Sequence, residues 1–296
     1  MTYKFNDFCY YVAGLWEGDG HCGSIPNPYI AITFNKKDYP LCLLLKYIFN
    51  ARIRYKNAEN ACVLTIQKRR DVFFFTQLIG DKLRTPKAIE IWEIARWLEK
   101  RFESSSIPLS LNSQVSLLKY SLDESPLNQN AWLAGYIDAD GGFKVRFTRK
   151  KVNFQKVRIA LSFIIEQRMV HKKSGLNMKF CMKNISDFLR IPLSIRKHNK
   201  KEYYCVELSS FSKLSILIEY LQKYSLLSSK HLDYLDWLDV YYKMVQQTHL
   251  IEEGKHDILT IKNGMNAKRT KFNWSHLLTL FCFVVIEMEI NYDTYK

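Results

Sequence analysis

One nine-residue pattern occurs twice in this chain of 296 residues, and the repeat constrains the fold more than any other feature. The two copies are VAGLWEGDG at residues 12–20 and LAGYIDADG at residues 133–141. Each has an apolar residue, Ala-Gly, two large apolar residues, an acid, a small residue and a final Asp-Gly. A duplication at this separation predicts two similar half-molecules in one chain. We expect each half to supply one carboxylate, Asp19 or Asp140, to a joint site.

Small residues lie four positions apart in each copy, Gly14 with Gly18 and Gly135 with Ala139. Positions i and i+4 share one face of a helix. A face without bulky side chains lets two helix backbones approach closely. We therefore expect the motifs to form two touching helices, whose large residues pack into their own halves. These large residues are Tyr11, Leu15, Trp132 and Tyr136.

The motif aspartates are expected at the ends of these touching helices. Gly20 and Gly141 fit helix ends because glycine adopts the left-handed conformation there at little cost. Two neighbouring carboxylates repel each other, and they also lie near the negative ends of two helix dipoles. A hard divalent cation such as Mg²⁺ binds carboxylates, backbone carbonyls and waters, and it fits this place. A generic helix pair with exposed acids explains one copy, but two matching copies favour the joint site.

The composition indicates a globular protein with a polyanionic partner. Hydrophobic residues make up 47% of the chain, which excludes a disordered class. Lys and Arg number 44 against 29 acids, a net charge of +15 that favours nucleic acid over a membrane. The seven cysteines form no CxxC pair and are interpreted as buried free thiols in a reducing compartment. We find no targeting segment, and the apolar run at 277–286 is too short to cross a bilayer.

Hydrophobic periodicity predicts an α+β protein in which one order of elements occurs twice. The expected divisions are an N-terminal half at residues 1–103, a polar linker at 104–130, a C-terminal half at 131–276 and a tail of unknown role at 277–296. Strands are expected at 21–25, 29–35, 52–56, 62–67, 144–148, 156–165, 193–198 and 203–208. Helices are expected at 40–50, 71–80, 86–102, 212–224 and 230–245, with another that ends near residue 189. The two pseudo-symmetric αββαββα halves are expected to form a saddle of two antiparallel sheets around the motif helices.

Charge alternates along the predicted strands, so that one face of each sheet is cationic and hydrogen-bonding while the other is apolar. Such a face suits a DNA groove. A solvated sheet face is the alternative, but the same bias on four strands makes it weaker. The candidate DNA-binding residues are Asn35, Arg52, Arg54, Lys56, Lys68, Arg69, Arg70, Lys144, Arg146, Thr148, Lys156, Arg158, Arg196, His198 and Lys200.

The two motifs resemble the defining signature of the LAGLIDADG homing endonucleases, in the two-motif form encoded by organellar group I introns. The resemblance covers approximately residues 10–276. It includes LRTPK at 83–87 and LLSSK at 226–230, before the last helix of each half, and the closing segments HLDYLDW at 231–237 and 258–274 with MNAKR at 265–269. It implies Asp19 and Asp140 as metal ligands, with backbone carbonyls of Gly18 and Ala139 beside them.

The resemblance also implies three further residues at the cleavage centre. Lys87 and Lys230 are candidates to polarise the attacking water or to stabilise charge on the phosphate, with a surface lysine at a helix start as the alternative for each. Gln167 matches a glutamine near the metals, but its first-half counterpart is Phe34, which predicts an asymmetric centre. Glu17 and Asp138, the other motif acids, are expected to make local hydrogen bonds.

The implied function is metal-dependent hydrolysis of both strands of a long, asymmetric DNA target by a monomer. Mg²⁺ is the expected cofactor, and Mn²⁺ or Ca²⁺ also suits the site; the metal ions are expected to activate water and to stabilise the leaving oxygen. The main alternative is a maturase that binds its own intron RNA, because a basic surface suits either polyanion. A DNA-binding protein without cleavage is disfavoured because both motif acids are present. The expected location is the mitochondrion, with the chloroplast as an alternative.

Overall fold

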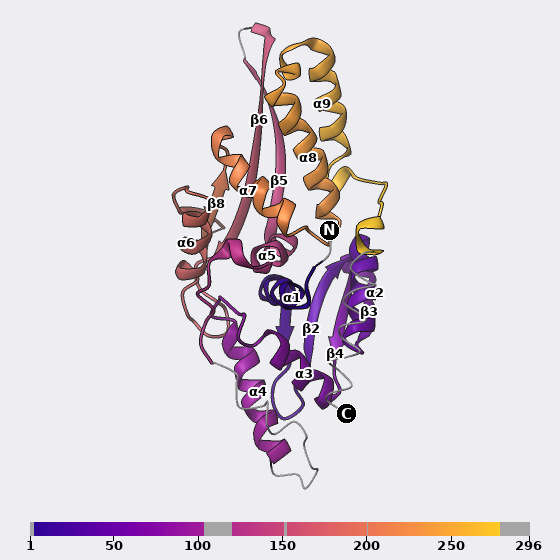
Figure 1. The fold of residues 1–296 in the computed structure, drawn as a ribbon, viewed down its shortest axis with the longest axis vertical. Helices are drawn as coiled ribbons and strands as arrows, with labels where there is room; N and C mark the ends of the chain where they lie inside the picture. The colour runs from indigo at the N-terminus through magenta and orange to yellow at the C-terminus, as the bar shows by residue number, and fades with distance from the viewer. Residues whose placement is uncertain (1–2, 104–119, 151–152, 200, 279–296) are drawn as a thin grey trace.

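The computed structural model describes residues 3–103, 120–150, 153–199 and 201–278. Two helix-and-sheet halves lie along the long axis of the molecule, and the motif helices α1 and α5 lie between them (Figure 1). The predicted α+β class is confirmed. Most of the expected linker and most of the expected tail lie outside the described residues, as does Lys200.

The first half contains one four-stranded antiparallel sheet with helices packed against it. Its helices are α1 (Phe5–Asp19), α2 (Tyr39–Ile48), α3 (Arg69–Ile79) and α4 (Ala88–Glu103). Its strands are β1 (Gly20–Cys22), β2 (Ile30–Asn35), β3 (Arg52–Lys56) and β4 (Ala61–Ile66). Pro40 lies in the first turn of α2, where its missing N–H costs no helical hydrogen bond.

The second half repeats this order and adds one helix among the described residues. Its helices are α5 (Trp132–Asp140), α6 (Lys179–Phe188), α7 (Leu214–Lys223), α8 (Lys230–Val245) and α9 (Glu252–Gly264). Its strands are β5 (Gly141–Lys150), β6 (Asn153–Arg168), β7 (Ser194–His198) and β8 (Lys201–Leu208). Strands β5 and β6 extend beyond their predicted ends because backbone pairing continues past the apolar alternation.

The two sheets are related residue by residue. Their strand orders, β1-β2-β4-β3 and β5-β6-β8-β7, are equivalent. Gly20 pairs with Ile32 in the first sheet, and Gly141 pairs with Ile165 in the second. The two glycines directly follow the motif aspartates, so this shared register sets equivalent positions in the two halves.

The motif helices touch through their backbones, as the small residues predict. A Cβ atom on Gly14 would lie 2.0 Å from the Trp132 carbonyl oxygen, and one on Gly135 would lie 1.9 Å from that of Tyr11. Any larger residue at either position would force the helices apart. The predicted close helix pair is therefore confirmed.

The predicted left-handed glycines at the helix ends are wrong. Gly20 has φ −82° and ψ 165°, and Gly141 has φ −78° and ψ 158°, so both are extended and start a strand at once. Glycine is required at both positions because a side chain would have no room. A Cβ on Gly20 would lie 2.2 Å from the Trp16 ring, and one on Gly141 would lie 2.7 Å from the Ile137 side chain.

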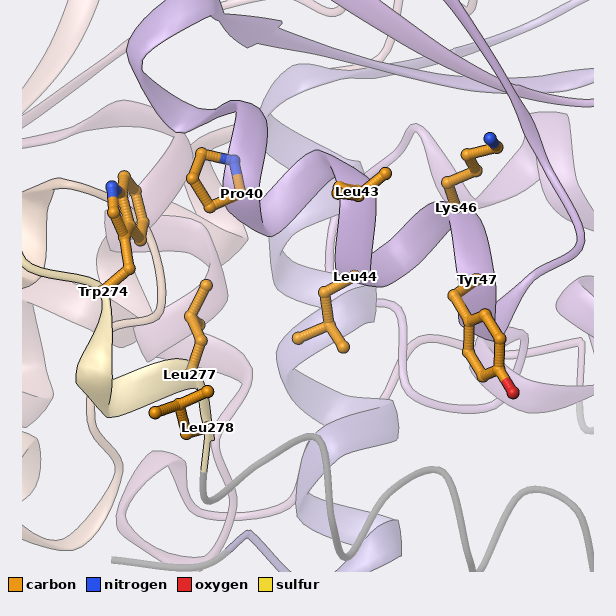
Figure 2. A pocket seen from close by; sticks show the side chains of 8 residues that line it. All are labelled: Pro40, Leu43, Leu44, Lys46, Tyr47, Trp274, Leu277 and Leu278. Carbon is orange, nitrogen blue, oxygen red and sulfur yellow. The ribbon is translucent and has the colours of Figure 1, made fainter.

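The closing segment of the second half reaches the first half. Trp274, Leu277 and Leu278 line one side of an apolar groove of about 410 Å³, and α2 lines the other through Leu43 and Tyr47 (Figure 2). Leu277 is buried, whereas Leu278 is exposed. Within the described ranges, no helix is long and apolar enough to cross a membrane.

Candidate active site

Asp19 and Asp140 end the two motif helices and lie close together at the centre of the molecule. A Cβ on Gly18 would lie 2.1 Å from the Ala139 Cβ and 3.2 Å from the Asp140 Oδ2 atom. The Asp140 carboxylate thus reaches back over the end of the opposite motif helix. The sequence prediction that the helix ends bring these acids together agrees with this geometry.

The electrostatic environment disfavours charge on both aspartates. Burial, followed by the neighbouring Asp140 carboxylate, raises the pKa of Asp19 to about 6. Burial also raises the pKa of Asp140 above its ordinary value. Lys230 and Lys87 act in the opposite direction on both groups, so the acids and the lysines form one charged centre.

Lys87 and Lys230 occupy matching places at this centre. Lys87 Nζ donates to the carbonyl oxygens of Trp16 at 2.9 Å and Glu17 at 3.1 Å. Lys230 Nζ donates to those of Ile137 at 3.0 Å and Ala139 at 2.7 Å. Each ammonium group therefore binds carbonyl oxygens in the last turn of the motif helix of its own half, at the negative end of the helix dipole. Burial lowers the pKa of both lysines, while the nearby carboxylates oppose that shift.

Glu17 is buried and does not point to the aspartate pair. Its carboxylate accepts hydrogen bonds from the Arg84 N–H at 2.9 Å, the Thr85 N–H at 2.6 Å and the Trp132 Nε1 at 2.7 Å. Burial raises the pKa of Glu17 despite these donors. The contacts tie α1 to the segment before α4 and to the opposite motif helix.

Asp138 repeats this arrangement in the second half. It accepts hydrogen bonds from the Tyr11 hydroxyl at 2.6 Å, the Leu227 N–H at 2.7 Å and the Ser228 N–H at 3.0 Å. The expectation that Glu17 and Asp138 make local hydrogen bonds agrees with these contacts. However, the expectation that Tyr11 and Trp132 pack only into their own halves is wrong, because each donates to the acid of the opposite half.

Gln167 distinguishes the two sides of the centre. Its Nε2 donates to Asp140 Oδ2 at 2.6 Å. It lies two residues beyond Ile165, the partner of Gly141, whereas the same step beyond Ile32 leads to Phe34. Phe34 is buried and cannot donate a hydrogen bond. The register therefore agrees with the sequence prediction that these residues are counterparts and that the centre is asymmetric.

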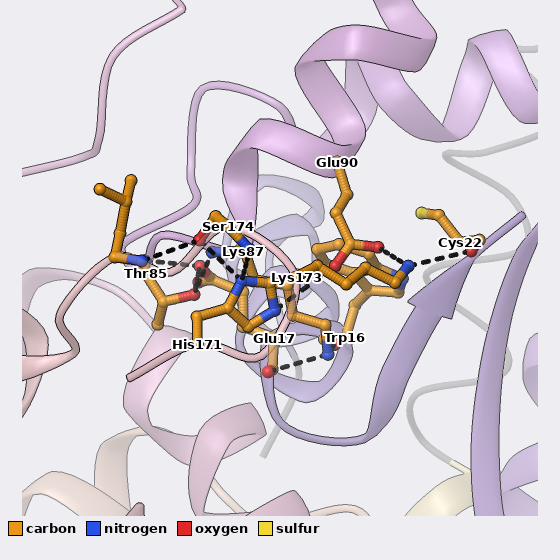
Figure 3. Close-up of polar contacts among 10 residues, drawn as sticks. Trp16, Glu17, Cys22, Thr85, Lys87, Glu90, His171, Lys173 and Ser174 are labelled. Carbon is orange, nitrogen blue, oxygen red and sulfur yellow. Dashed lines mark hydrogen bonds and ion pairs between the residues drawn. The ribbon is translucent and has the colours of Figure 1, made fainter. Parts of the chain in front are cut away.

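The loop that follows β6 contacts the start of α4 in the other half. Lys173 Nζ donates to Glu90 Oε2 at 2.6 Å and to the Cys22 carbonyl oxygen at 3.2 Å, and His171 Nε2 lies 3.4 Å from Glu90 Oε1 (Figure 3). Burial acts to raise the pKa of Glu90, but His171 and Lys173 outweigh it, so the pKa is lowered. Figure 3 draws these residues beside Lys87 and Glu17.

A second contact between the halves lies on the pseudo-symmetric side. Asp38, which follows β2, accepts a hydrogen bond at 2.7 Å from the backbone N–H of Ser229, next to Lys230. Sequence reasoning missed both contacts between the halves. The matching segments before Lys87 and Lys230 were the available sequence signal for these positions. They did not reveal the contact partners, which lie far away along the chain.

The second sheet has the predicted polar face. The register places Lys144, Arg146 and Thr148 on the same side as Arg158, Arg196 and His198. Acids share that face: Glu207 pairs with Arg146 and Arg196, and Glu166 pairs with Arg196 at 3.5 Å and His198 at 2.8 Å. The face is thus an array of paired charges, not uniformly cationic. The Lys156 side chain lies outside the described part of the structure.

The first sheet has a smaller cationic face. Arg52, Arg54 and Lys56 share it with Asn35, as the pairing with β4 requires. Lys56 pairs with Glu59 at 3.1 Å, and Asn35 accepts a hydrogen bond from the Lys37 N–H at 3.1 Å. Exposed basic residues follow β4 at the start of α3: Lys68, Arg69 and Arg70.

The aspartate pair fits a hard cation by its chemistry. Both carboxylates are oxygen donors. Burial raises the pKa of each, the neighbouring Asp140 carboxylate raises that of Asp19 further, and a bound cation would oppose these effects. Backbone carbonyls of Gly18 and Ala139 lie at the same helix ends, and that of Ala139 accepts a hydrogen bond from Lys230. Among the described residues, no group of three or more His, Cys, Asp or Glu side chains is placed to hold a metal ion.

Comparisons with known proteins agree on one family. The family model described as LAGLIDADG endonuclease matches residues 133–241. The probable intron-encoded DNA endonuclease aI1 of Mycosarcoma maydis is 32% identical over 117 residues, which cover 39% of this chain and 94% of that protein. The intron-encoded DNA endonuclease aI3 of Saccharomyces cerevisiae is 28% identical, over 90% of this chain and 71% of its own length.

Solved structures show the same fold. The I-LtrWI LAGLIDADG homing endonuclease bound to target DNA has a TM-score of 0.70 at 19% identity, covering 90% of this chain and 100% of its own. The I-SmaMI LAGLIDADG homing endonuclease bound to cleaved DNA has a TM-score of 0.68 at 20% identity, covering 88% and 98%.

Proposed function

The chain belongs to the LAGLIDADG endonuclease family, and on that basis we propose that it cuts both strands of a long, asymmetric DNA site by metal-dependent hydrolysis. One observation carries the proposal. Asp19 and Asp140 lie close together at two touching helix ends, between two sheets that each have a face of basic side chains. Each carboxylate serves one of the two DNA strands.

The aspartates bind the divalent cations, with Mg²⁺ as the physiological ion and Mn²⁺ or Ca²⁺ as substitutes. When bound, such an ion lowers the pKa of water and stabilises charge on the phosphate and the leaving oxygen. Gln167 orients the Asp140 carboxylate through its hydrogen bond. Lys87 and Lys230 hold positive charge beside the acids, where it stabilises an anionic transition state.

The two sheet faces follow the DNA grooves on either side of the cut. Arginine and lysine side chains there contact phosphates, which fixes position, and base edges, which gives specificity. The paired acids Glu166 and Glu207 hold Arg196 in one orientation before DNA arrives. This arrangement favours a defined sequence over any polyanion.

The related proteins are encoded by introns, and one relative is named for intron 2 of cox1. This supports a role in intron homing for a protein encoded in the mitochondrion, and the presence of both motifs in one chain supports a monomer. The chloroplast remains the alternative location. Intron RNA is a further possible ligand of the basic faces, although the two motif acids and their charged centre favour nuclease chemistry.

The test uses a plasmid that carries the uninterrupted host sequence on both sides of the intron insertion site. The wild-type chain is expected to linearise the plasmid with Mg²⁺ and to leave it intact in EDTA. Asp19→Asn and Asp140→Asn are expected to bind the same duplex without linearising it. Asp187→Asn is the matched control, because Asp187 is exposed on α6 and its one ion pair within the described residues is with Lys183. Normal cutting by either motif variant would exclude the assigned roles.

A further inference from the structure

Each half contacts the other through the segment that follows its second strand. After β2, Asp38 accepts a hydrogen bond from the Ser229 N–H at 2.7 Å. After β6, His171 and Lys173 contact Glu90. The two loops are equivalent under the pseudo-symmetry, but Ser229 and Glu90 are not equivalent positions. The first contact joins a carboxylate to a backbone N–H, and the second is ionic.

Both contacts end beside a lysine of the charged centre. Ser229 directly precedes Lys230. Glu90 follows Lys87 by one turn, and the Glu90 N–H donates to the Lys87 carbonyl oxygen at 3.0 Å. A shift of either contact therefore moves the backbone that carries the corresponding lysine.

The strands that lead into the contacts also end at the centre. Gln167, bound to Asp140, lies four residues before His171. Phe34 lies four residues before Asp38. Each contact thus joins a strand end of one half to the lysine-bearing helix start of the other.

We propose that Glu90 and Asp38 are positioning residues, each of which holds one of the two lysines in register with the aspartate pair. The contact of Glu90 with His171 and Lys173 sets the position of Lys87, and the contact of Asp38 with Ser229 sets that of Lys230. Because the two contacts are separate, the two strand cleavages are tuned separately. This inference rests on the proposed nuclease function.

The charges in the Glu90 contact favour a fixed geometry. The Glu90 side chain is largely buried, and its carboxylate contacts the Lys173 ammonium group and the His171 imidazole of the other half. Lys173 additionally donates to the Cys22 carbonyl oxygen, at the end of β1. One lysine therefore ties the loop after β6 to both the first sheet and α4.

The first test measures the cutting rate of each DNA strand with separately end-labelled duplexes. Lys87→Met and Lys230→Met identify the strand that each lysine serves. Glu90→Gln is expected to slow cleavage of the DNA strand served by Lys87 roughly tenfold, since small misplacements of a reacting group carry large rate costs. The cleavage rate of the other DNA strand is expected to change little. Lys173→Met is expected to reproduce this effect, and Lys173→Arg to retain the wild-type ratio.

Asp38→Asn is expected to slow cleavage of the DNA strand served by Lys230 instead. Glu99→Gln is the control, because Glu99 lies on α4 and bonds Tyr120, away from the contact. Equal slowing of both strands, or no change in the ratio, would overturn the proposal and assign these residues a merely structural role.

A second test needs no cleavage, so it separates this inference from the proposed function. Competitive acetylation with peptide mass spectrometry reports the accessibility of each lysine in the folded protein. Glu90→Gln is expected to raise labelling of Lys87 severalfold but not that of Lys230, and Asp38→Asn to do the reverse. Unchanged labelling of both lysines would overturn the positioning role even if the wild-type protein cuts DNA. If the wild-type protein does not cut DNA, the proposed function fails while the labelling result still decides this inference.

Discussion

Trp132 and Glu17 are joined across the two halves by a buried hydrogen bond of 2.7 Å from the indole Nε1 to the carboxylate. The Tyr11 hydroxyl makes the equivalent bond to Asp138 at 2.6 Å. Each motif helix thus satisfies the buried acid of the other. Glu17 and Asp138 consequently hold the helix pair together, while the aspartates two residues later remain at the centre.

The first prediction concerns the Trp132–Glu17 bond. Trp132→Phe leaves a buried carboxylate short of one donor, which costs about 1–3 kcal/mol in addition to the lost packing. Trp237→Phe is a matched control, since Trp237 is also fully buried but its Nε1 has no hydrogen-bond partner among the described residues. Urea unfolding is expected to show the larger loss of free energy of unfolding for Trp132→Phe. Equal losses would mean that the bond contributes nothing beyond packing.

The second prediction concerns DNA binding without metal. The Asp19 and Asp140 carboxylates lie where phosphates are proposed to bind, so their charges oppose binding when no cation is present. Asp140→Asn is therefore expected to raise DNA affinity severalfold in EDTA, and the difference is expected to shrink when Ca²⁺ is added. Fluorescence anisotropy with a labelled target measures both conditions. Weaker binding by the variant in EDTA would contradict the placement of phosphates at this pair.

The third prediction concerns pH. The pKa of Asp19 is about 6 in the folded protein, against about 4 in an unfolded chain. Between these values the folded state binds more protons, so this group lowers the free energy of unfolding as pH rises from about 4 to 6. In EDTA, Asp19→Asn is expected to be more stable than the wild type at pH 7, with the difference declining toward pH 4. Thermal unfolding at both pH values checks this sign, and a constant difference would refute it.

How much of the fold and of the candidate site could be predicted from the sequence depends on how far apart along the chain the interacting residues lie. The motif helices, their contact through Gly14 and Gly135 and the pairing of Asp19 with Asp140 follow from short periodic patterns. Strand faces follow from alternation, which placed Arg146 and Arg196 correctly. Their pairing with Glu207 was missed because that acid lies on a third strand, and register between strands is not written in any one of them.

Contacts between the halves were the least predictable part of the site. Tyr11 and Trp132 donate to the acids of the opposite half because of how the two helices are placed against each other. A pattern of small residues predicts that the helices touch, but it does not predict which side chains reach across. The Glu90 contact joins residues separated by more than 80 positions. Helix-end geometry at Gly20 was predicted wrongly because a strand starts there without an intervening turn.

The fourth prediction concerns the paired charges on the second sheet. Affinity for DNA is expected to fall steeply with salt through counterion release. Arg146→Ala is expected to weaken specific binding by about 1–3 kcal/mol if the side chain contacts a base bidentately. Glu207→Gln removes the acid that pairs with both Arg146 and Arg196, and leaves Arg196 paired with Glu166. It is therefore expected to strengthen nonspecific binding severalfold and to lower the ratio of specific to nonspecific affinity. Titrations against target and scrambled duplexes distinguish these outcomes, and a flat salt dependence would exclude a groove-lining role.

The last prediction concerns where the folded second half ends. Leu277 is buried in the groove against α2, and its N–H donates to the Trp274 carbonyl oxygen at 3.0 Å. A chain ending at Leu278 is therefore expected to fold and cut DNA as the full chain does. A chain ending at His276 loses the burial of Leu277, which costs about 1.5–3 kcal/mol, and is expected to unfold at a lower temperature. Insolubility or lower stability of the chain ending at Leu278 would contradict this prediction and would mean that residues beyond Leu278 contribute to the fold. Leu43→Asn and Tyr47→Asn would then test whether the groove in Figure 2 is the surface involved.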